Sequence, residues 1–184
     1  MRSNPLLDRL KTYPQTALDQ KKREVLAAGR TLFDFGTGDP IEPTPPFVLD
    51  AIRSAIPEIS QYPEVLGPRP LREAIAGYCR RRFGAALDPE TQILPTSGSK
   101  EAVFHLPFAF VDPAAEDRIV VHPDPGYPVY ERGTLFAGGI PHAQALSGDF
   151  VQRPWELPEE ILRRTRMIWI NSPHNPSGAV MSRA

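Results

Sequence analysis

Hydrophobic and polar positions follow two different periods along the chain. Where apolar residues recur every three or four positions, amphipathic helices are indicated, and these segments are 47–56, 68–84, 99–110, 126–139 and 157–165. Short apolar runs indicate buried strands, and they occur at 31–35, at the start of 91–98, at 117–123, more weakly near 140, and at 166–170. Apolar strands that alternate with helices are typical of a parallel sheet covered by helices. The pattern therefore predicts an α/β fold.

The helix at 68–84 has the clearest ends. Pro70 suits its first turn, Gly84 suits its stop, and three arginines precede that glycine, where cations favour the helix dipole. Residues 1–30 are polar and broken by comparison. They are expected to form an arm that packs on another part of the protein.

Composition narrows the class of protein. The chain has 184 residues, a formal net charge of −1 and 41% hydrophobic residues, so neither nucleic acid nor an anionic membrane is an expected partner. The single cysteine, Cys79, excludes an internal disulfide and a cysteine-based zinc cluster, and no metal site is predicted. No apolar leader and no run of roughly 18 apolar residues is present, so we expect a cytoplasmic protein.

Three polar loops follow predicted strands, where functional loops of such sheets gather. They are TSGSK (96–100), HPDPGYP (122–128) and NSPHNPSG (171–178). In the first, Gly98 permits a tight turn and a helix begins at once, so free N–H groups favour a phosphate. The G-x-x-x-x-G-K-S/T spacing of a nucleotide-binding P-loop is absent. The alternative is that Ser99 is a plain helix N-cap.

The other two loops carry an aromatic ring and an amide. Tyr127 can lay its ring on a flat ligand, or simply cover the end of the sheet. Asn175 lies between His174 and Pro176, so its amide is held and could contact a phenolate oxygen and a carboxylate together. The alternative is an asparagine that only forms a turn. His174 is expected to be a surface histidine rather than a ligand or a base.

The order of these segments resembles a known family. FGTGDPIEPTPP, YPEVLGPRPLREAIAGYCRRRFG, ILPTSGSKEAV, DPGYPVYE and NSPHNPSGAV together are similar to the class I/II aminotransferases, the aspartate-aminotransferase-like enzymes of pyridoxal-phosphate (PLP) fold type I. The last segment resembles the family's N-P-x-N-P-S/T-G motif. The resemblance implies the PLP-dependent transferase fold type I: an α/β, parallel-rich sheet sandwiched by helices, incomplete because the C-terminal part is absent. It also implies an arm and small-domain segment at 1–45 and part of the large PLP-binding domain at 46–184.

The resemblance implies a role for each matching residue around pyridoxal 5'-phosphate. Gly98, Ser99 and the Lys100 backbone would surround the phosphate, and Tyr127 would stack on the pyridine ring. Asn175 would hold the ring hydroxyl oxygen and one oxygen of the substrate carboxylate.

Two further residues extend this expectation to the substrate and to a second subunit. Gly38 would place its backbone N–H against the α-carboxylate of the substrate. Tyr62 resembles the tyrosine that reaches the cofactor phosphate in the neighbouring subunit's site, which implies a homodimer. Ser177 stands where threonine is commoner in the family.

The implied reaction transfers an amino group between an amino acid, with glutamate as the usual donor, and a 2-oxo acid. NPLLDRLKTYP and the run at 71–104 look most like the succinyldiaminopimelate transaminase branch, whose acceptor is N-succinyl-2-amino-6-oxopimelate in lysine biosynthesis. In the family, the Schiff-base lysine, the acidic partner of the ring nitrogen and the carboxylate-binding arginine lie downstream of the last motif. We therefore expect a truncated sequence that is inactive by itself, with the lysine beyond Ala184, and not a catalytic Lys100.

Other classes of protein share parts of this pattern. A non-catalytic module could use the same loops to bind a phosphorylated small molecule or a partner chain. A PLP-dependent carbon–sulfur lyase or a cyclopropane-carboxylate synthase would have the same cofactor loops. An aminotransferase-like domain of a transcription regulator would need a DNA-binding domain ahead of residue 1, and the arm beginning directly after Met1 argues against it.

Overall fold

The computed structural model describes residues 3–10, 14–36, 38 and 40–182. Within the segment FGTGDPIEPTPP, Thr37 and Asp39 lie outside the described residues. The chain divides into two compact units, one made of Met1–Ala17 with Thr96–Ala184 and the other of Leu18–Pro95. The domain boundary predicted at residues 45 and 46 concerns the complete fold and stays a prediction.

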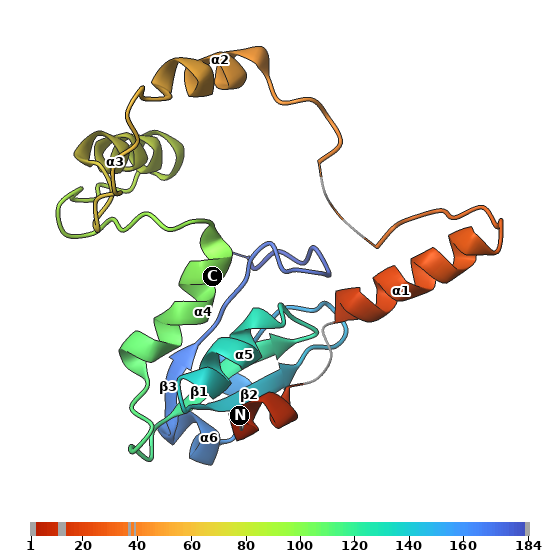
Figure 1. Ribbon diagram of the computed structural model, residues 1–184. Helices are drawn as coiled ribbons and strands as arrows, with labels where there is room; N and C mark the ends of the chain where they lie inside the picture. Colours follow the sequence, from red (N-terminus) through yellow and green to blue (C-terminus); the bar gives the residue numbers. More distant parts are fainter. Residues whose placement is uncertain (1–2, 11–13, 37, 39, 183–184) are drawn as a thin grey trace. The chain divides into compact units, whose positions relative to one another are not determined.

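A parallel sheet lies at the centre of the first unit. Its strands are β1 (Ile119–Asp124), β2 (Ile140–Ala145) and β3 (Thr165–Ile168), in the order β2-β1-β3 (Figure 1). Both neighbours run parallel to β1. The predicted parallel sheet is therefore confirmed, including the weak strand near residue 140.

The central strand is the most deeply buried part of this unit. Val120 and Val121 are fully buried and Ile119 is 3% exposed, as expected for a strand covered on both faces. Val120 packs with Val111 and Ala137, and the partly buried Met167 and Trp169 pack against this cluster.

Two helices pack together beside the sheet. They are α4 (Ser99–Phe110) and α5 (Val129–Phe136), and both agree with the predicted helices, although α5 is shorter. Gly133 in α5 lies so close to α4 that a Cβ at this position would be 2.6 Å from the Phe104 carbonyl oxygen. The absence of a side chain thus lets the two helices approach closely.

Short helices complete the first unit. They are η1 (Pro5–Arg9), η2 (Pro154–Glu156) and α6 (Glu159–Arg163), and the last lies within the helix predicted at 157–165. Asn4 caps η1, because its side chain accepts a hydrogen bond from the Leu6 N–H at 2.9 Å.

The arm expected at residues 1–30 contains a helix that the sequence analysis missed. α1 (Pro14–Ala27) begins at a proline and is rich in residues with high helix propensity, which explains why it forms despite its polar sequence. A Lys21–Glu24 ion pair at 3.0 Å supports it, as charged pairs three residues apart do on a helix surface.

The second unit contains two predicted helices, α2 (Pro46–Ala55) and α3 (Arg69–Phe83). Gly84 ends α3 in the left-handed conformation, with φ of 70°, so the predicted stop is confirmed.

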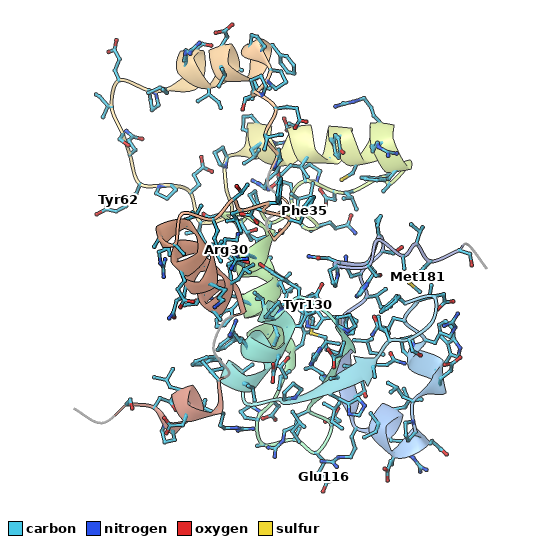
Figure 2. All side chains as sticks on the ribbon, turned by 90° about the vertical axis from the view of Figure 1, so that its right-hand side faces the viewer. Arg30, Phe35, Tyr62, Glu116, Tyr130 and Met181 are labelled. Atoms are coloured by element: carbon cyan, nitrogen blue, oxygen red, sulfur yellow. The ribbon has the colours of Figure 1, made fainter. Side chains whose placement is uncertain are left out.

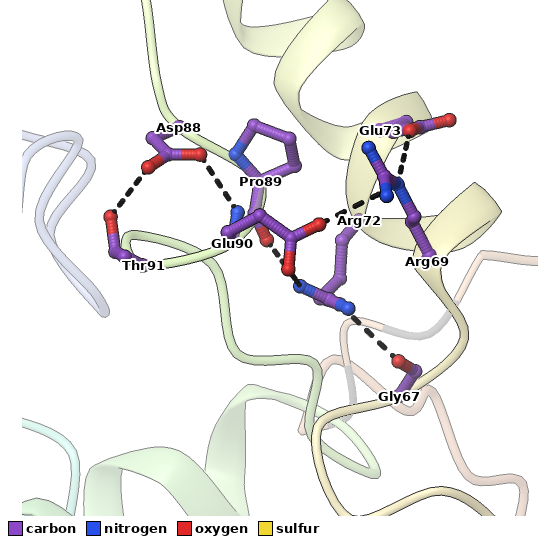
Figure 3. Close-up of polar contacts among 8 residues, drawn as sticks. All are labelled: Gly67, Arg69, Arg72, Glu73, Asp88, Pro89, Glu90 and Thr91. Carbon is purple, nitrogen blue, oxygen red and sulfur yellow. Dashed lines mark hydrogen bonds and ion pairs between the residues drawn. The ribbon is translucent and has the colours of Figure 1, made fainter.

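A buried arginine in α3 hydrogen-bonds to the segment that follows this helix. Arg72 is 6% exposed and donates to the Pro89 carbonyl at 2.6 Å and to the Gly67 carbonyl at 3.3 Å (Figure 3). It also pairs with Glu90 at 3.3 Å. These bonds hold the 84–95 segment on α3 and satisfy the buried charge.

The strands predicted at 31–35 and at the start of 91–98 are wrong for this structure, because neither segment is extended in a sheet. A strand needs a neighbour to satisfy its backbone hydrogen bonds. Phe33 and Leu94, 79% and 65% exposed, are not covered by such a neighbour. The apolar character of both segments was recognised correctly, but a partner strand decides whether it produces β-structure.

Candidate functional site

Two of the three predicted loops leave adjacent strands at the same edge of the sheet. Residues 125–128 follow β1 directly, and residues 171–178 follow β3 after Trp169 and Ile170. Because β1 and β3 are parallel neighbours, their carboxyl ends lie side by side. The structure thus brings together two loops that are separated by more than forty residues of sequence.

Tyr127 lies on a row of aromatic rings. It is half-buried, and its ring meets Tyr130 edge-on at 5.9 Å and 87°. Tyr130 in turn stacks on Trp169 at 5.1 Å and 24°. Burial, and secondarily the neighbouring Tyr127, raises the pKa of Tyr130 above its ordinary value. These contacts hold one edge of the Tyr127 ring. The sequence does not reveal the row, because Trp169 lies about forty residues after the two tyrosines.

Tyr127 also borders a cavity. This space, of about 220 Å³, is lined among others by Asp124, Glu131 and Arg132 of the same unit, and by Arg9 from η1. The ring is therefore accessible on part of its surface while its edge is packed.

The amide of Asn175 is exposed at the end of a fixed loop. Its backbone N–H donates to Asn171 Oδ1 at 2.7 Å, and the loop closes where the Gly178 N–H donates to the His174 carbonyl at 2.7 Å. The Asn175 side-chain amide hydrogen-bonds to none of the other described residues. The loop thus presents an amide that is available to a ligand.

His174 is buried, and its expected place at the surface is wrong. It is 4% exposed, with Nδ1 at 2.7 Å from Ser177 Oγ and Nε2 at 3.0 Å from the Pro125 carbonyl oxygen. A histidine beside two prolines and a serine is usual for a surface turn, so the sequence alone does not predict this burial. The contact with Pro125 appears only when the two loops meet.

The third loop presents a helix end without a side-chain cap. Gly98 is the N-cap of α4, with φ of 91°, and as a glycine it makes no side-chain capping bond. The simple N-cap expected as the alternative for Ser99 is therefore not formed. The loop is tightened instead by the Gly98 N–H, which donates to the Thr96 carbonyl at 2.8 Å. The N-terminus of a helix such as α4 favours an anion.

Lys100 occupies the second position of α4. Its side chain borders a cavity of about 280 Å³ together with Glu101, Phe104 and Arg132. The backbone of Lys100 belongs to the first turn of α4, and its expected contact with a phosphate stays a prediction.

Gly38 and Tyr62 belong to the second unit. A Cβ on Gly38 would meet no atom within 4 Å, and the Tyr62 side chain is fully exposed on its loop (Figure 2). Their predicted contacts with substrate and with a neighbouring subunit stay predictions.

The donor set at the edge of the first unit fits a phosphorylated aromatic cofactor such as PLP. The uncapped start of α4 suits a phosphate, the half-buried Tyr127 ring suits a flat heterocycle, and the unengaged Asn175 amide suits a ring oxygen. Within the described part of the chain, no group of three or more metal-ligating side chains is present. None of the described helices has the length and apolar character that crossing a membrane requires.

Known proteins are similar to this chain in sequence and in architecture. A model of the family Aminotransferase class I and II matches residues 30–184. An LL-diaminopimelate aminotransferase of Aquifex aeolicus is 41% identical, over 94% of this chain and 46% of its own length. Substrate-bound BacF of Bacillus subtilis superimposes with a TM-score of 0.87 at 26% identity, over 99% of this chain and 47% of that one. Aspartate aminotransferase of Thermus thermophilus with maleate gives 0.83 at 31% identity, over 100% and 48%.

These matches confirm the PLP fold type I expected from the sequence, present here in part, since the chain spans about half the length of the curated relatives it matches. Enzymes of this family use pyridoxal 5'-phosphate, the cofactor that the loops fit. By sequence and by architecture, the chain belongs to the class I and II aminotransferase family.

Proposed function

We propose that the whole protein is a PLP-dependent aminotransferase that transfers an amino group between an amino acid and a 2-oxo acid. The observation that carries the proposal is the meeting of the Tyr127 and Asn175 loops at the carboxyl ends of two parallel neighbours. Membership of the aminotransferase family supports it independently.

In this proposal each loop of the first unit has one task. The backbone N–H groups of Ser99 and Lys100, aligned by the turn at Gly98, donate to the cofactor phosphate. Tyr127 holds one face of the pyridine ring, and the Asn175 amide donates to the ring oxygen and to a substrate carboxylate oxygen. When bound, PLP supplies the electron-withdrawing ring that makes the α-proton of an amino acid removable. The chain's own groups bind and orient both molecules.

Two residues of the second unit have proposed roles toward the same ligands. Gly38 would donate its backbone N–H to the substrate α-carboxylate. Tyr62, which is fully exposed, would reach the cofactor phosphate of a second copy. The proposal therefore includes a homodimer in which each subunit contributes to the partner's site.

We place LL-diaminopimelate first among the amino-acid substrates, with 2-oxoglutarate and glutamate as the pair that accepts and carries the amino group. The curated relatives carry the name LL-diaminopimelate aminotransferase, in Aquifex aeolicus and in Gloeobacter violaceus. These relatives do not bear the N-succinyl name suggested by the sequence, so N-succinyl-LL-diaminopimelate, whose 2-oxo partner is N-succinyl-2-amino-6-oxopimelate, is the second amino acid to test. We propose lysine biosynthesis as the pathway and the cytoplasm as the location.

The test uses the longest natural translation product that contains residues 1–184. After addition of PLP, we expect a visible absorbance band and 2-oxoglutarate-dependent consumption of LL-diaminopimelate, with N-succinyl-LL-diaminopimelate and aspartate compared in parallel. Asn175→Ala removes a hydrogen bond to a charged oxygen, worth about 1.5–3 kcal/mol, so kcat/KM should fall roughly 10- to 150-fold.

Glu159→Gln is the matched surface control, because Glu159 is exposed on α6 and pairs there with Arg163 at 3.0 Å. It should leave kcat/KM unchanged. A protein that is folded but gains no visible band with PLP and consumes none of the three amino acids would refute the proposed function. Activity with aspartate alone would keep the aminotransferase and reject the lysine pathway.

A further inference from the structure

A buried histidine joins the two loops that carry the proposed cofactor contacts. The His174 side chain is held between Pro125, 49 residues earlier in the chain, and Ser177, three residues later. Pro125 lies two residues before Tyr127, and His174 is the neighbour of Asn175. A single imidazole ring therefore spans the gap between the ring-binding loop and the amide-bearing loop.

The contact with Pro125 fixes one proton of the ring. A carbonyl oxygen only accepts hydrogen bonds, so Nε2 must carry a proton and donate it to Pro125 at 3.0 Å. In the neutral imidazole Nδ1 is then the acceptor, and the Ser177 hydroxyl donates to it at 2.7 Å. Ser177 Oγ in turn accepts from the Ala179 N–H at 3.2 Å. All three groups are satisfied at once in this Nε2–H tautomer.

We propose that His174 is a positioning residue, which sets the separation of the Tyr127 and Asn175 loops through its Nε2–H bond to the Pro125 carbonyl. The proposal rests on the proposed function only for the identity of the ligand that the loops hold. The ring is rigid and 4% exposed, so it fixes this separation with little freedom. The Ser177 hydroxyl orients the ring, and a serine or threonine would serve equally at that position.

Two amide variants separate the two bonds of the ring. In His174→Gln the side-chain N–H₂ can reach the place of Nε2 and keep the bond to Pro125, while the bond to Ser177 is lost. In His174→Asn the shorter amide reaches the place of Nδ1 and keeps Ser177, while Pro125 loses its donor. Each variant removes one hydrogen bond, so both should lower global stability similarly.

The first measurement needs no cofactor. Long-range ¹H–¹⁵N correlation on the uniformly labelled protein should show His174 as the Nε2–H tautomer, its peaks being assigned as the set that His174→Gln deletes. The Tyr130 amide, which donates to the Tyr127 carbonyl at 3.1 Å, reports the ring-binding loop. Its hydrogen exchange should be about 5- to 10-fold faster in His174→Asn and near the wild-type rate in His174→Gln, as expected for one lost hydrogen bond.

The second measurement is the rate of PLP release from the natural full-length protein. His174→Asn should release PLP about 5- to 10-fold faster than the wild type, and His174→Gln less than about twofold faster. If His174 only supported stability, both variants would show the same change in PLP release and in Tyr130 exchange. Equal release rates and equal Tyr130 exchange in the two variants, or a proton on Nδ1 in place of Nε2, would overturn the proposal.

The two proposals can fail separately. If the wild-type protein binds no PLP, the proposed function fails, and the tautomer and the Tyr130 exchange still decide whether His174 couples the loops. If PLP binds but the variants do not differ, the function stands and the role of His174 is rejected.

Discussion

Replacing Gly133 with alanine tests how closely α4 and α5 are packed. A Cβ at this position would lie 2.6 Å from the Phe104 carbonyl oxygen, which belongs to the backbone and cannot rotate away. The helices would have to separate by roughly 0.7–1 Å to restore an ordinary carbon–oxygen distance of about 3.3–3.6 Å. Overpacking of this kind costs about 1–3 kcal/mol.

The same substitution also has a favourable part. Alanine is better than glycine inside a helix by about 0.5–1 kcal/mol. The net change expected for Gly133→Ala is therefore a loss of about 1 kcal/mol in the free energy of unfolding. Because α4 begins at the Gly98 turn and α5 begins just after Tyr127, separation of the helices would also weaken the proposed binding of PLP.

Gly77→Ala is the matched control for this prediction. Gly77 lies inside α3, and its Cβ would meet only the end of the flexible Arg81 side chain, at 3.1 Å. This variant should be as stable as the wild type or more stable by up to about 1 kcal/mol. Since helix propensity contributes equally to both changes, the difference between them, about 2 kcal/mol, isolates the packing strain.

The assay is urea unfolding followed by far-ultraviolet circular dichroism, which reports helices throughout the chain. The free energy of unfolding is compared for the wild type, Gly133→Ala and Gly77→Ala under identical conditions. If Gly133→Ala proves as stable as Gly77→Ala, the close contact between α5 and the Phe104 carbonyl is not present in solution and the reasoning is wrong.

Three further predictions address other parts of the chain. Arg72→Met leaves the Pro89 and Gly67 carbonyls without their donor and should cost about 1–3 kcal/mol in urea unfolding; an unchanged midpoint would contradict this. A hydrogen bond from Arg153 lowers the pKa of Asp149 to about 2, so its contribution to stability is full above about pH 4 and is lost as the pH falls through 2. Arg153→Gln should raise the pKa of Asp149, measured as the midpoint of a carboxyl-carbon NMR titration. An unchanged pKa would refute the pairing. In the variant Trp155→Phe, acrylamide should quench the remaining fluorescence less than in the wild type, because Trp155 is 66% exposed and Trp169 is packed against the core; equal quenching would be inconsistent with that burial.

The elements that depend on local sequence were predicted well. The ends of α3 follow from a proline at the start and from Gly84 at the stop, and the structure has both. β1 is predicted by its own apolar run, and even the weaker β2 lies where it was expected. Local propensity and pattern were sufficient in these segments because each residue's preference agrees with its place in the fold.

The failures at 31–35 and at His174 involve partners that are distant in sequence, whereas the missed helix α1 follows from local propensity that its polar sequence obscured. The apolar segment at 31–35 has no strand beside it in the described part of the chain. His174 was expected at the surface, but the Pro125 carbonyl buries it. A sequence pattern shows what a residue prefers, whereas burial of this kind is decided by a residue 49 positions away.

The strand order β2-β1-β3 also determines when the two loops can meet during synthesis. Ile119 of β1 pairs with Ile140 of β2 and with Thr165 of β3. The chain segment that must close to form the second pair is therefore about twice as long as the segment for the first. Each doubling adds only about 0.6 kcal/mol of entropic cost, so the thermodynamic difference is small. The order of emergence from the ribosome matters more, because β1, α5 and β2 can associate before residue 165 is made. The Tyr127 loop can therefore form on a partial sheet before residue 165 is made, and it meets the Asn175 loop only after β3 and His174 have emerged.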